Sequence, residues 1–227
     1  MKLVPAGGSP QMQRALAHPY VHTVSSILLQ HPELLRIVAP LLKAYDQHAQ
    51  TGLSTALEKL RLSQSRPGDA GLTPPGYVVE LVTVLHNLYQ QRDEDIRYQR
   101  GAILEVLVYQ LVSPRYKAGE CQSDYRFVDG QGRGVTEQID IAAISPVKRE
   151  IEGYECKVKA IGIESPHCTG LAYLAEIAQQ EGYNANVGFV TLDDEKQVRR
   201  RIAHLHSSTA LKAYGLDNLE LLGRNPF

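Results

Sequence analysis

Charged residues interrupt two short segments of the chain that are otherwise rich in β-forming residues. Asp140 lies in Glu137–Ile144, and Glu155 and Lys157 lie in Tyr154–Ala160. Alternate residues of a strand share a face, so Asp140 is set apart from its apolar neighbours, and Glu155 and Lys157 share one face. Two carboxylates in one place repel each other unless they share a proton or hold a cation. Hard oxygen ligands with an open site suit Mg²⁺ or Mn²⁺, and a lysine alongside would balance the remaining charge.

A third acid precedes these segments. Glu105 is the only acidic or basic residue between Gly101 and Val112, in a segment otherwise made of Ala, Ile, Leu, Val, Tyr and Gln. The surrounding segment Ile96–Val112 has apolar residues nearly all round, which is typical of a buried helix. The placement of Glu105 in such a helix makes it a third candidate for the same site.

The second half of the chain alternates between strand and helix patterns. Helical patterns cover Pro166–Glu181 and Asp194–His206, and the apolar segment Leu219–Leu222 is expected to form a last strand. The order of helix, three strands, helix, strand and helix predicts an α/β fold with a mixed central sheet flanked by helices. Four strands are expected before the last: Tyr125–Val128, Glu137–Ile144, Tyr154–Ala160 and Asn186–Leu192.

Prolines divide the first third of the chain into helices. Pro10, Pro19 and Pro32 each fit the first turn of a helix, where no backbone donor is needed, and Ser54 is expected to begin a further short helix. The stretch Ser65–Gly76 holds several prolines and glycines, which break both helices and strands. These patterns predict an all-helical N-terminal region over 1–64, a linker over 65–76 and a second domain over 77–227.

An acid on a helix, then Asp140, then Glu155-Cys156-Lys157 resembles the PD-(D/E)XK, or restriction-endonuclease-like, nuclease superfamily over roughly Tyr77–Phe227. The resemblance implies a restriction-endonuclease-like core in which Asp140, Glu155 and Glu105 hold Mg²⁺ or Mn²⁺ and Lys157 lies near the attacking water. It implies a metal-dependent endonuclease, with DNA favoured over RNA and a homodimer for cutting duplexes. The sequence departs from the nominal pattern in having Ile139, not proline, before Asp140.

Basic residues outside the motif are candidates for binding a nucleic-acid backbone. Lys159 shares the face of Glu155 and Lys157, and Arg199 and Arg200 lie on a basic turn of an expected helix. A surface ion pair or a solvated helix face explains the same residues equally well. The net charge of -1 does not decide between these interpretations.

Composition is that of a folded, water-soluble protein. Apolar residues make up 43% and charged residues 22% of the chain, and no stretch is apolar for long enough to cross a membrane. We therefore expect a cytoplasmic protein. The three cysteines lack Cys-x-x-Cys spacing, which favours reduced thiols over a disulfide framework or a zinc ribbon.

Two other interpretations remain open at this point. The chain is also compatible with a degenerate nuclease-fold protein that binds nucleic acid or a protein partner without cutting. Alternatively, the strands are misassigned, the acids belong to surface salt bridges, and the chain is a helical interaction protein.

Overall fold

The computed structural model describes residues 1–44, 58, 75–91 and 93–227. These residues divide into two compact units: Met1–Ser9 together with Val108–Phe227, and Pro10–Leu107. The expected linker over 65–76 lies outside the described residues except for its last two, so that prediction stays open. The structure groups the elements differently from the expected division, because the boundary between the units falls within helix α6 (Asp93–Val112).

The Pro10–Leu107 unit is helical in its described part. The three helix starts expected at prolines are confirmed, while the helix expected after Ser54 lies outside the described residues except for Glu58. A buried Ser25 hydroxyl donates to the Ile103 carbonyl at 3.0 Å, and the Tyr89 hydroxyl donates to the Leu41 carbonyl at 2.6 Å. Its described elements are α1 (Pro10–Leu16), α2 (Pro19–Gln30), the 3-10 turn η1 (Pro32–Leu34), α3 (Leu35–Lys43), α5 (Gly76–Tyr89) and the first part of α6.

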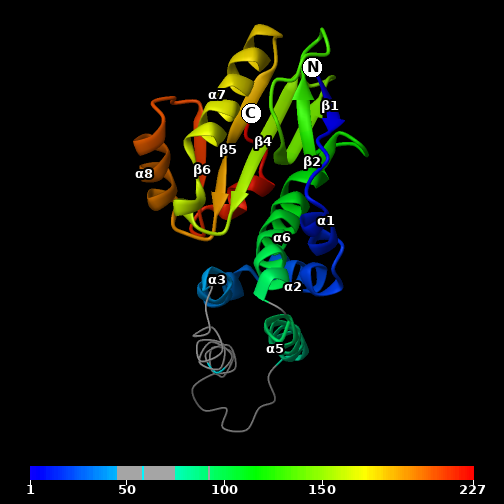
Figure 1. Cartoon of the computed structure of the whole chain (residues 1–227), viewed down its shortest axis with the longest axis vertical. Coiled ribbons are helices and arrows are strands. Elements are labelled where there is room, and N and C mark those ends of the chain that lie inside the picture. Colours follow the sequence, from blue (N-terminus) through cyan, green and yellow to red (C-terminus); the bar gives the residue numbers. More distant parts are fainter. Residues whose placement is uncertain (45–57, 59–74, 92) are drawn as a thin grey trace. The chain divides into compact units, whose positions relative to one another are not determined.

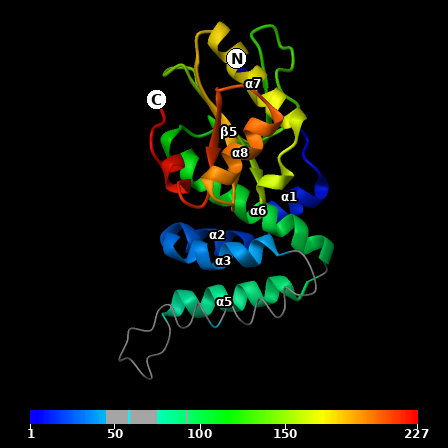
Figure 2. The same ribbon diagram turned by 90° about the vertical axis from the view of Figure 1, so that its left-hand side faces the viewer.

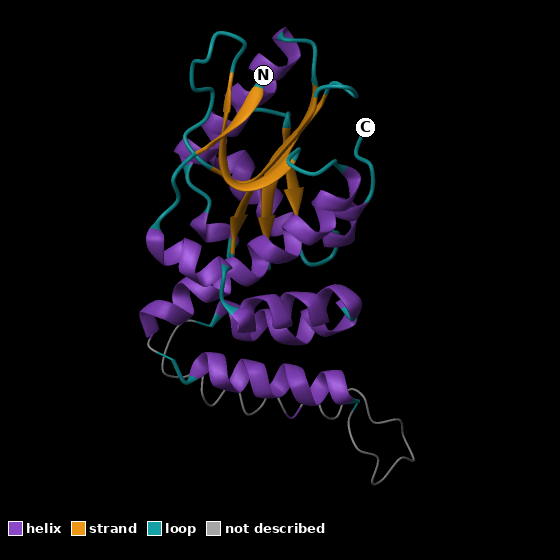
Figure 3. Cartoon of the chain, turned by 90° about the vertical axis from the view of Figure 1, so that its right-hand side faces the viewer, coloured by secondary structure: helices purple, strands orange, loops and turns teal. Residues whose placement is uncertain are grey.

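The other unit is built on a mixed six-stranded sheet (Figure 3). The strands lie in chain order. Neighbours from the first to the fourth strand are antiparallel, and the last two pairings are parallel. The expected α/β class is thus confirmed. The strands are β1 (Lys2–Pro5), β2 (Cys121–Val128), β3 (Ile139–Ser145), β4 (Glu150–Lys157), β5 (Asn184–Thr191) and β6 (Leu211–Tyr214).

The two ends of the sheet differ from the expectation. The first residues of the chain form β1, which pairs with β2, so the N-terminal region is not all helical. The prediction of a strand at Leu219–Leu222 is wrong. This segment forms the 3-10 helix η4 (Leu219–Gly223), and the last strand is β6. The Asn218 side chain accepts from the Gly215 amide and donates to the Ala213 carbonyl, which turns the chain sharply after β6. Leu219 and Leu222 are then both buried, at the three-residue spacing of a helical turn.

Two helices cross over between the parallel strands. Helix α7 (Ser165–Gln180) connects β4 to β5, and α8 (Glu195–Leu205) connects β5 to β6 (Figure 1). Both crossovers run in the same direction across the sheet, and crossovers of this kind are almost always right-handed, which places both helices on one face. Seen from the side in Figure 2, α8 lies over β5. Gly182, at φ +75°, ends α7 in the left-handed conformation that favours glycine.

The hydrophobic core of this unit lies between the sheet and these two helices. Gly153 on β4 permits close packing of α7, since a Cβ atom there would lie 3.1 Å from Leu174 Cδ2. Leu171 and Ile202 bring the two helices into the same core as the strand residues Ile144 and Phe189. The core holds α7 against β4, the strand that carries two of the candidate site residues.

No helix in the described part of the chain is long and apolar enough to span a bilayer.

Candidate active site

Asp140 and Glu155 lie next to each other on adjacent strands. The β3–β4 register pairs Ala142 with Gly153 and Ile141 with Tyr154, so Asp140 and Glu155 are the next residues across. Residues directly opposite in an antiparallel pair share a face of the sheet. At this point the Asp140 carboxylate, through Oδ2, accepts the backbone amide of Cys156 at 2.7 Å. The amide thus fixes the carboxylate of Asp140 beside the strand that carries Glu155.

Lys157 joins the two carboxylates. Its Nζ lies 2.8 Å from Glu155 Oε2 and 3.4 Å from Asp140 Oδ2. Positions 155 and 157 of β4 face the same side, which is why the ammonium reaches both acids. The structure therefore brings together three of the four residues that the sequence nominated.

Burial and mutual charge set the protonation of these groups. Burial, and then the negative charge of Asp140, raise the pKa of Glu155 to about 7, although Lys157 opposes the shift. Burial alone would lower the pKa of the Lys157 ammonium, but Asp140 and Glu155 together raise it above its usual value. Lys157 therefore stays protonated at neutral pH. Glu155 loses its proton near neutral pH, and its carboxylate can then bind a cation.

These side chains open onto a cleft of about 840 Å³. Its carboxyl and ammonium lining groups belong to Glu137, Asp140, Glu155 and Lys157, so carboxyl groups outnumber ammonium groups three to one. A cleft with this charge balance disfavours a polyanion unless a cation is bound first. The remaining lining residues are Gly134, Val135, Thr136, Gln138, Ile139 and, from the start of α7, Ser165, Pro166, His167, Thr169, Gly170 and Leu171.

Glu105 belongs to the other unit. It lies in α6 as expected, and only 2% of it is exposed. The structure thus confirms a buried acid in a buried helix, and the role of Glu105 as a metal ligand stays a prediction.

The proposed backbone-binding residues lie outside this cleft. Lys159, Arg199 and Arg200 are all exposed, and none of them lines the cleft. Arg199 donates to Glu195 one helical turn earlier, with its Nε 2.7 Å from Oε1. Exposure of this helix face agrees with the solvated face that the sequence left open as the alternative, and on it Arg199 forms a surface ion pair.

Besides Glu137 in the lining of the cleft, two ionisable residues near the site were not nominated from the sequence. Asp124 on β2 lies between residues that pair with Ile141 and Ile139, which places it opposite Asp140. Burial, and then the charge of Asp140, raise the pKa of Asp124, and Gln138 donates to its carboxylate at 2.6 Å. The second residue is His167, in the first turn of α7. No local pattern marks either one, because each comes to the site through the pairing or packing of a different element.

The carboxylates of Asp140 and Glu155 suit a hard cation that binds few protein ligands. In the described ranges, no three His, Cys, Asp or Glu side chains form a ready-made metal site. Mg²⁺, however, is usually held by one or two carboxylates, with water and substrate phosphates completing the octahedron. Asp140 and Glu155 supply such a pair, and the excess of negative charge in the cleft favours a cation. The three cysteines, Cys121, Cys156 and Cys168, are buried.

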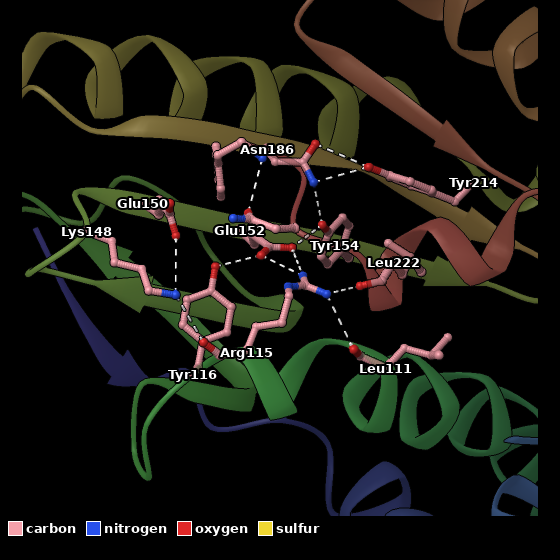
Figure 4. A network of polar contacts seen from close by, with 12 residues as sticks. Leu111, Arg115, Tyr116, Lys148, Glu150, Glu152, Tyr154, Asn186, Tyr214 and Leu222 are labelled. Carbon is pink, nitrogen blue, oxygen red and sulfur yellow. Dashed lines mark hydrogen bonds and ion pairs between the residues drawn. The ribbon is translucent and has the colours of Figure 1, made fainter. Parts of the chain in front are cut away.

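The opposite face of β4 carries a buried polar network (Figure 4). Glu152, which is 1% exposed, accepts two hydrogen bonds of 2.6 Å from Arg115, one of 2.6 Å from Tyr116 and a further one from Tyr154. Asn186 on β5 extends the network by donating to the hydroxyl of Tyr154 at 2.6 Å. The sequence indicated an apolar face here, because Tyr154 and Cys156 alternate with Glu155 and Lys157.

A search for related proteins finds no family model that matches the chain and no curated protein that matches it.

Proposed function

We propose that the chain is a metal-dependent nuclease of the PD-(D/E)XK type, with a restriction-endonuclease-like core, that hydrolyses phosphodiester bonds in DNA. The observation that carries the proposal is the convergence of Asp140, Glu155 and Lys157 on one cleft from two adjacent strands. The mixed sheet with helices α7 and α8 on one face suits this assignment. The strands at these positions leave no support for the interpretation as a helical interaction protein.

Asp140 and Glu155 would hold Mg²⁺ or Mn²⁺, with Glu105 as the further ligand that the resemblance implies. When bound, the metal supplies Lewis-acid polarisation of the phosphate and lowers the pKa of bound water. Asp140 is already fixed for this role by the amide of Cys156. Glu155 gives up its proton near neutral pH, so its carboxylate is available to a cation at the pH of a cell.

Lys157 acts as a charge and a hydrogen-bond donor in this proposal. Because Asp140 and Glu155 keep it protonated, it does not serve as the general base. Once a cation neutralises the two carboxylates, the ammonium is free to donate to the attacking water or to a phosphoryl oxygen. Fixed donors aimed at developing negative charge typically contribute about 10²–10³-fold to the rate.

The test is a cleavage assay with plasmid, linear duplex, single-stranded DNA and RNA in Mg²⁺, Mn²⁺ or chelator. The wild type is expected to cut DNA only with metal. Asp140→Ala and Lys157→Ala are each expected to lose at least about a hundredfold in rate. Lys148→Ala is the matched control, because Lys148 is a half-exposed lysine that lies outside the cleft.

Three other outcomes would change the proposal. Binding of DNA without cutting would favour a degenerate nuclease fold that binds its partner without cleavage. Preferential cutting of RNA would keep the site and change the substrate. If Lys148→Ala lost as much activity as Lys157→Ala, the cleft would no longer be assigned as the active site. A homodimer, expected for duplex cutting, is checked by the mass of the protein in solution.

A further inference from the structure

The α7 side of the cleft carries one ionisable side chain among its described residues. This wall consists of Ser165, Pro166, His167, Thr169, Gly170 and Leu171. Apart from His167, these side chains are small, hydroxylated or apolar, so they leave room for a ligand and offer it no charge. Asp140, Glu155 and Lys157 line the same cleft from β3 and β4. A substrate that enters the cleft is therefore bounded by the candidate catalytic residues and by His167.

The imidazole of His167 is incompletely satisfied within the described structure. Its Nδ1 is buried and has no hydrogen-bond partner among the described residues. A buried polar atom left in this state typically costs about 1–3 kcal/mol. A ring that served only to fill space would be replaced at lower cost by an apolar side chain of similar size. The ring as a whole is half-buried and lines the cleft, so its exposed part is placed to contact what occupies the cleft.

The surroundings of His167 keep it neutral. Burial, and then the positive charge of Lys157, lower the pKa of the imidazole, while the carboxylates of Glu164, Asp140 and Glu137 oppose the shift. A neutral imidazole offers one N–H donor and one acceptor nitrogen. The ring thus provides a donor that carries no charge.

An uncharged donor suits a site whose carboxylates must hold a cation. A lysine or arginine at position 167 would bring a second positive charge to the cleft and compete with a metal for its carboxylates. A neutral N–H group does not compete in this way, yet it still donates to an anionic oxygen. Charge and geometry together therefore favour a contact between His167 and the substrate, not the metal.

We propose that His167 is a further catalytic residue, whose imidazole donates a hydrogen bond to a non-bridging oxygen of the phosphate being cut. This inference rests on the proposed nuclease function. Lys157 contacts the same phosphate group from β4, so the phosphate is held from two elements of the fold. The contact stabilises the negative charge that gathers on the phosphoryl oxygens, and no proton is transferred to or from the ring.

The test compares His167→Ala and His167→Gln with the wild type in single-turnover cleavage of the preferred DNA, together with direct Mn²⁺ binding. Removing a donor of this kind is expected to lower the cleavage rate about a hundredfold at saturating DNA. His167→Gln keeps an N–H donor and is expected to retain more activity than His167→Ala. Both variants are expected to bind Mn²⁺ as tightly as the wild type. His167→Gln is expected to unfold at close to the wild-type temperature, since Nδ1 has no hydrogen bond among the described residues to lose.

His204→Ala provides the matched control, because His204 is an exposed histidine of α8 outside the cleft, and it is expected to cut at the wild-type rate. Wild-type rates in both His167 variants would overturn the inference and leave the proposed function standing. Loss of Mn²⁺ binding in His167→Ala would also overturn it, by placing His167 at the metal. A wild type that cuts no substrate would remove the proposed function, and this inference with it.

Discussion

Replacing Glu155 with glutamine is expected to abolish metal-dependent cleavage and, at pH 8, to make the protein harder to unfold. The loss of activity follows from the loss of a metal ligand. A bound metal typically contributes several kcal/mol to the transition state. A loss of about 4 kcal/mol corresponds to a rate decrease of about a thousandfold. Lys157 stays paired with Asp140 in the variant, so the remaining charges of the site are still balanced.

The gain in stability follows from the raised pKa of Glu155. The folded protein binds the proton of Glu155 with a pKa of about 7, against 4.5 for an unperturbed glutamate. Ionised Glu155 therefore destabilises the folded state. The penalty is absent below pH 4.5, grows as the pH rises toward 7, and is fully present above 7. At about 1.4 kcal/mol for each pKa unit, the penalty at pH 8 is on the order of 3 kcal/mol. The buried amide of glutamine removes part of the benefit.

The measurement is thermal unfolding in chelator at pH 8 and at pH 5, followed by the same measurement with Mg²⁺. Glu155→Gln is expected to unfold at a higher temperature than the wild type at pH 8, with a smaller difference at pH 5. Mg²⁺ is expected to stabilise the wild type and not the variant. Glu137→Gln makes the same chemical change at an exposed position of the cleft, and its stability is expected to change by less than about 0.5 kcal/mol. A wild type that unfolds at the same temperature as Glu155→Gln at pH 8 would contradict the electrostatic account of this residue.

Replacing Arg115 with methionine is expected to destabilise the protein by about 3–5 kcal/mol, because it leaves Glu152 as an unpaired buried charge. Glu152 receives two hydrogen bonds from Arg115, and only 1% of it is exposed. Arg115 also donates to the carbonyl of Leu222, so its loss removes a contact between this network and η4 (Figure 4). The tyrosine hydroxyls that remain on Glu152 donate hydrogen bonds but carry no compensating charge.

Urea unfolding of Arg115→Met, Glu152→Leu and the double variant measures this effect. The double variant is expected to recover much of the loss, since apolar residues of similar volume often replace a buried ion pair with little change in stability. Arg133→Met is the control, because Arg133 is 74% exposed and pairs with Asp129 at 2.7 Å. Because the Arg133 guanidinium is solvated, a pair of this kind contributes about 0–1 kcal/mol. Equal destabilisation in the Arg115 and Arg133 variants would show that burial of Glu152 does not control the effect.

Much of the fold was readable from local patterns. Pro10, Pro19 and Pro32 marked the helix starts because a proline at the first helical position loses no hydrogen bond. Alternation of polar and apolar residues identified β3 and β4 and placed Glu155 and Lys157 on one face. The same local reasoning failed at Leu219–Leu222, where apolar residues fit a helical turn as well as a strand.

Features that depend on pairing between distant segments were not readable. The strand β1 is four residues long. It pairs with β2, which lies more than a hundred residues later in the chain. Glu152 lies on the face of β4 that was expected to be apolar. Its buried charge is balanced by Arg115, which comes from another element and donates to both carboxylate oxygens. Asp124 comes opposite Asp140 through the β2–β3 register, which no short pattern encodes.

The sequence by itself determined which residues are able to do chemistry here: a lone Asp140 among apolar neighbours, and Glu155 two positions before Lys157 in a strand. These are properties of residue type and short-range periodicity, which the chain carries before it folds. Only the tertiary structure decided that Asp140 lies opposite Glu155 and that α7 brings His167 to the same cleft. Register and helix packing arise from burial and hydrogen bonding between segments far apart in the chain, so they exist only once those segments meet.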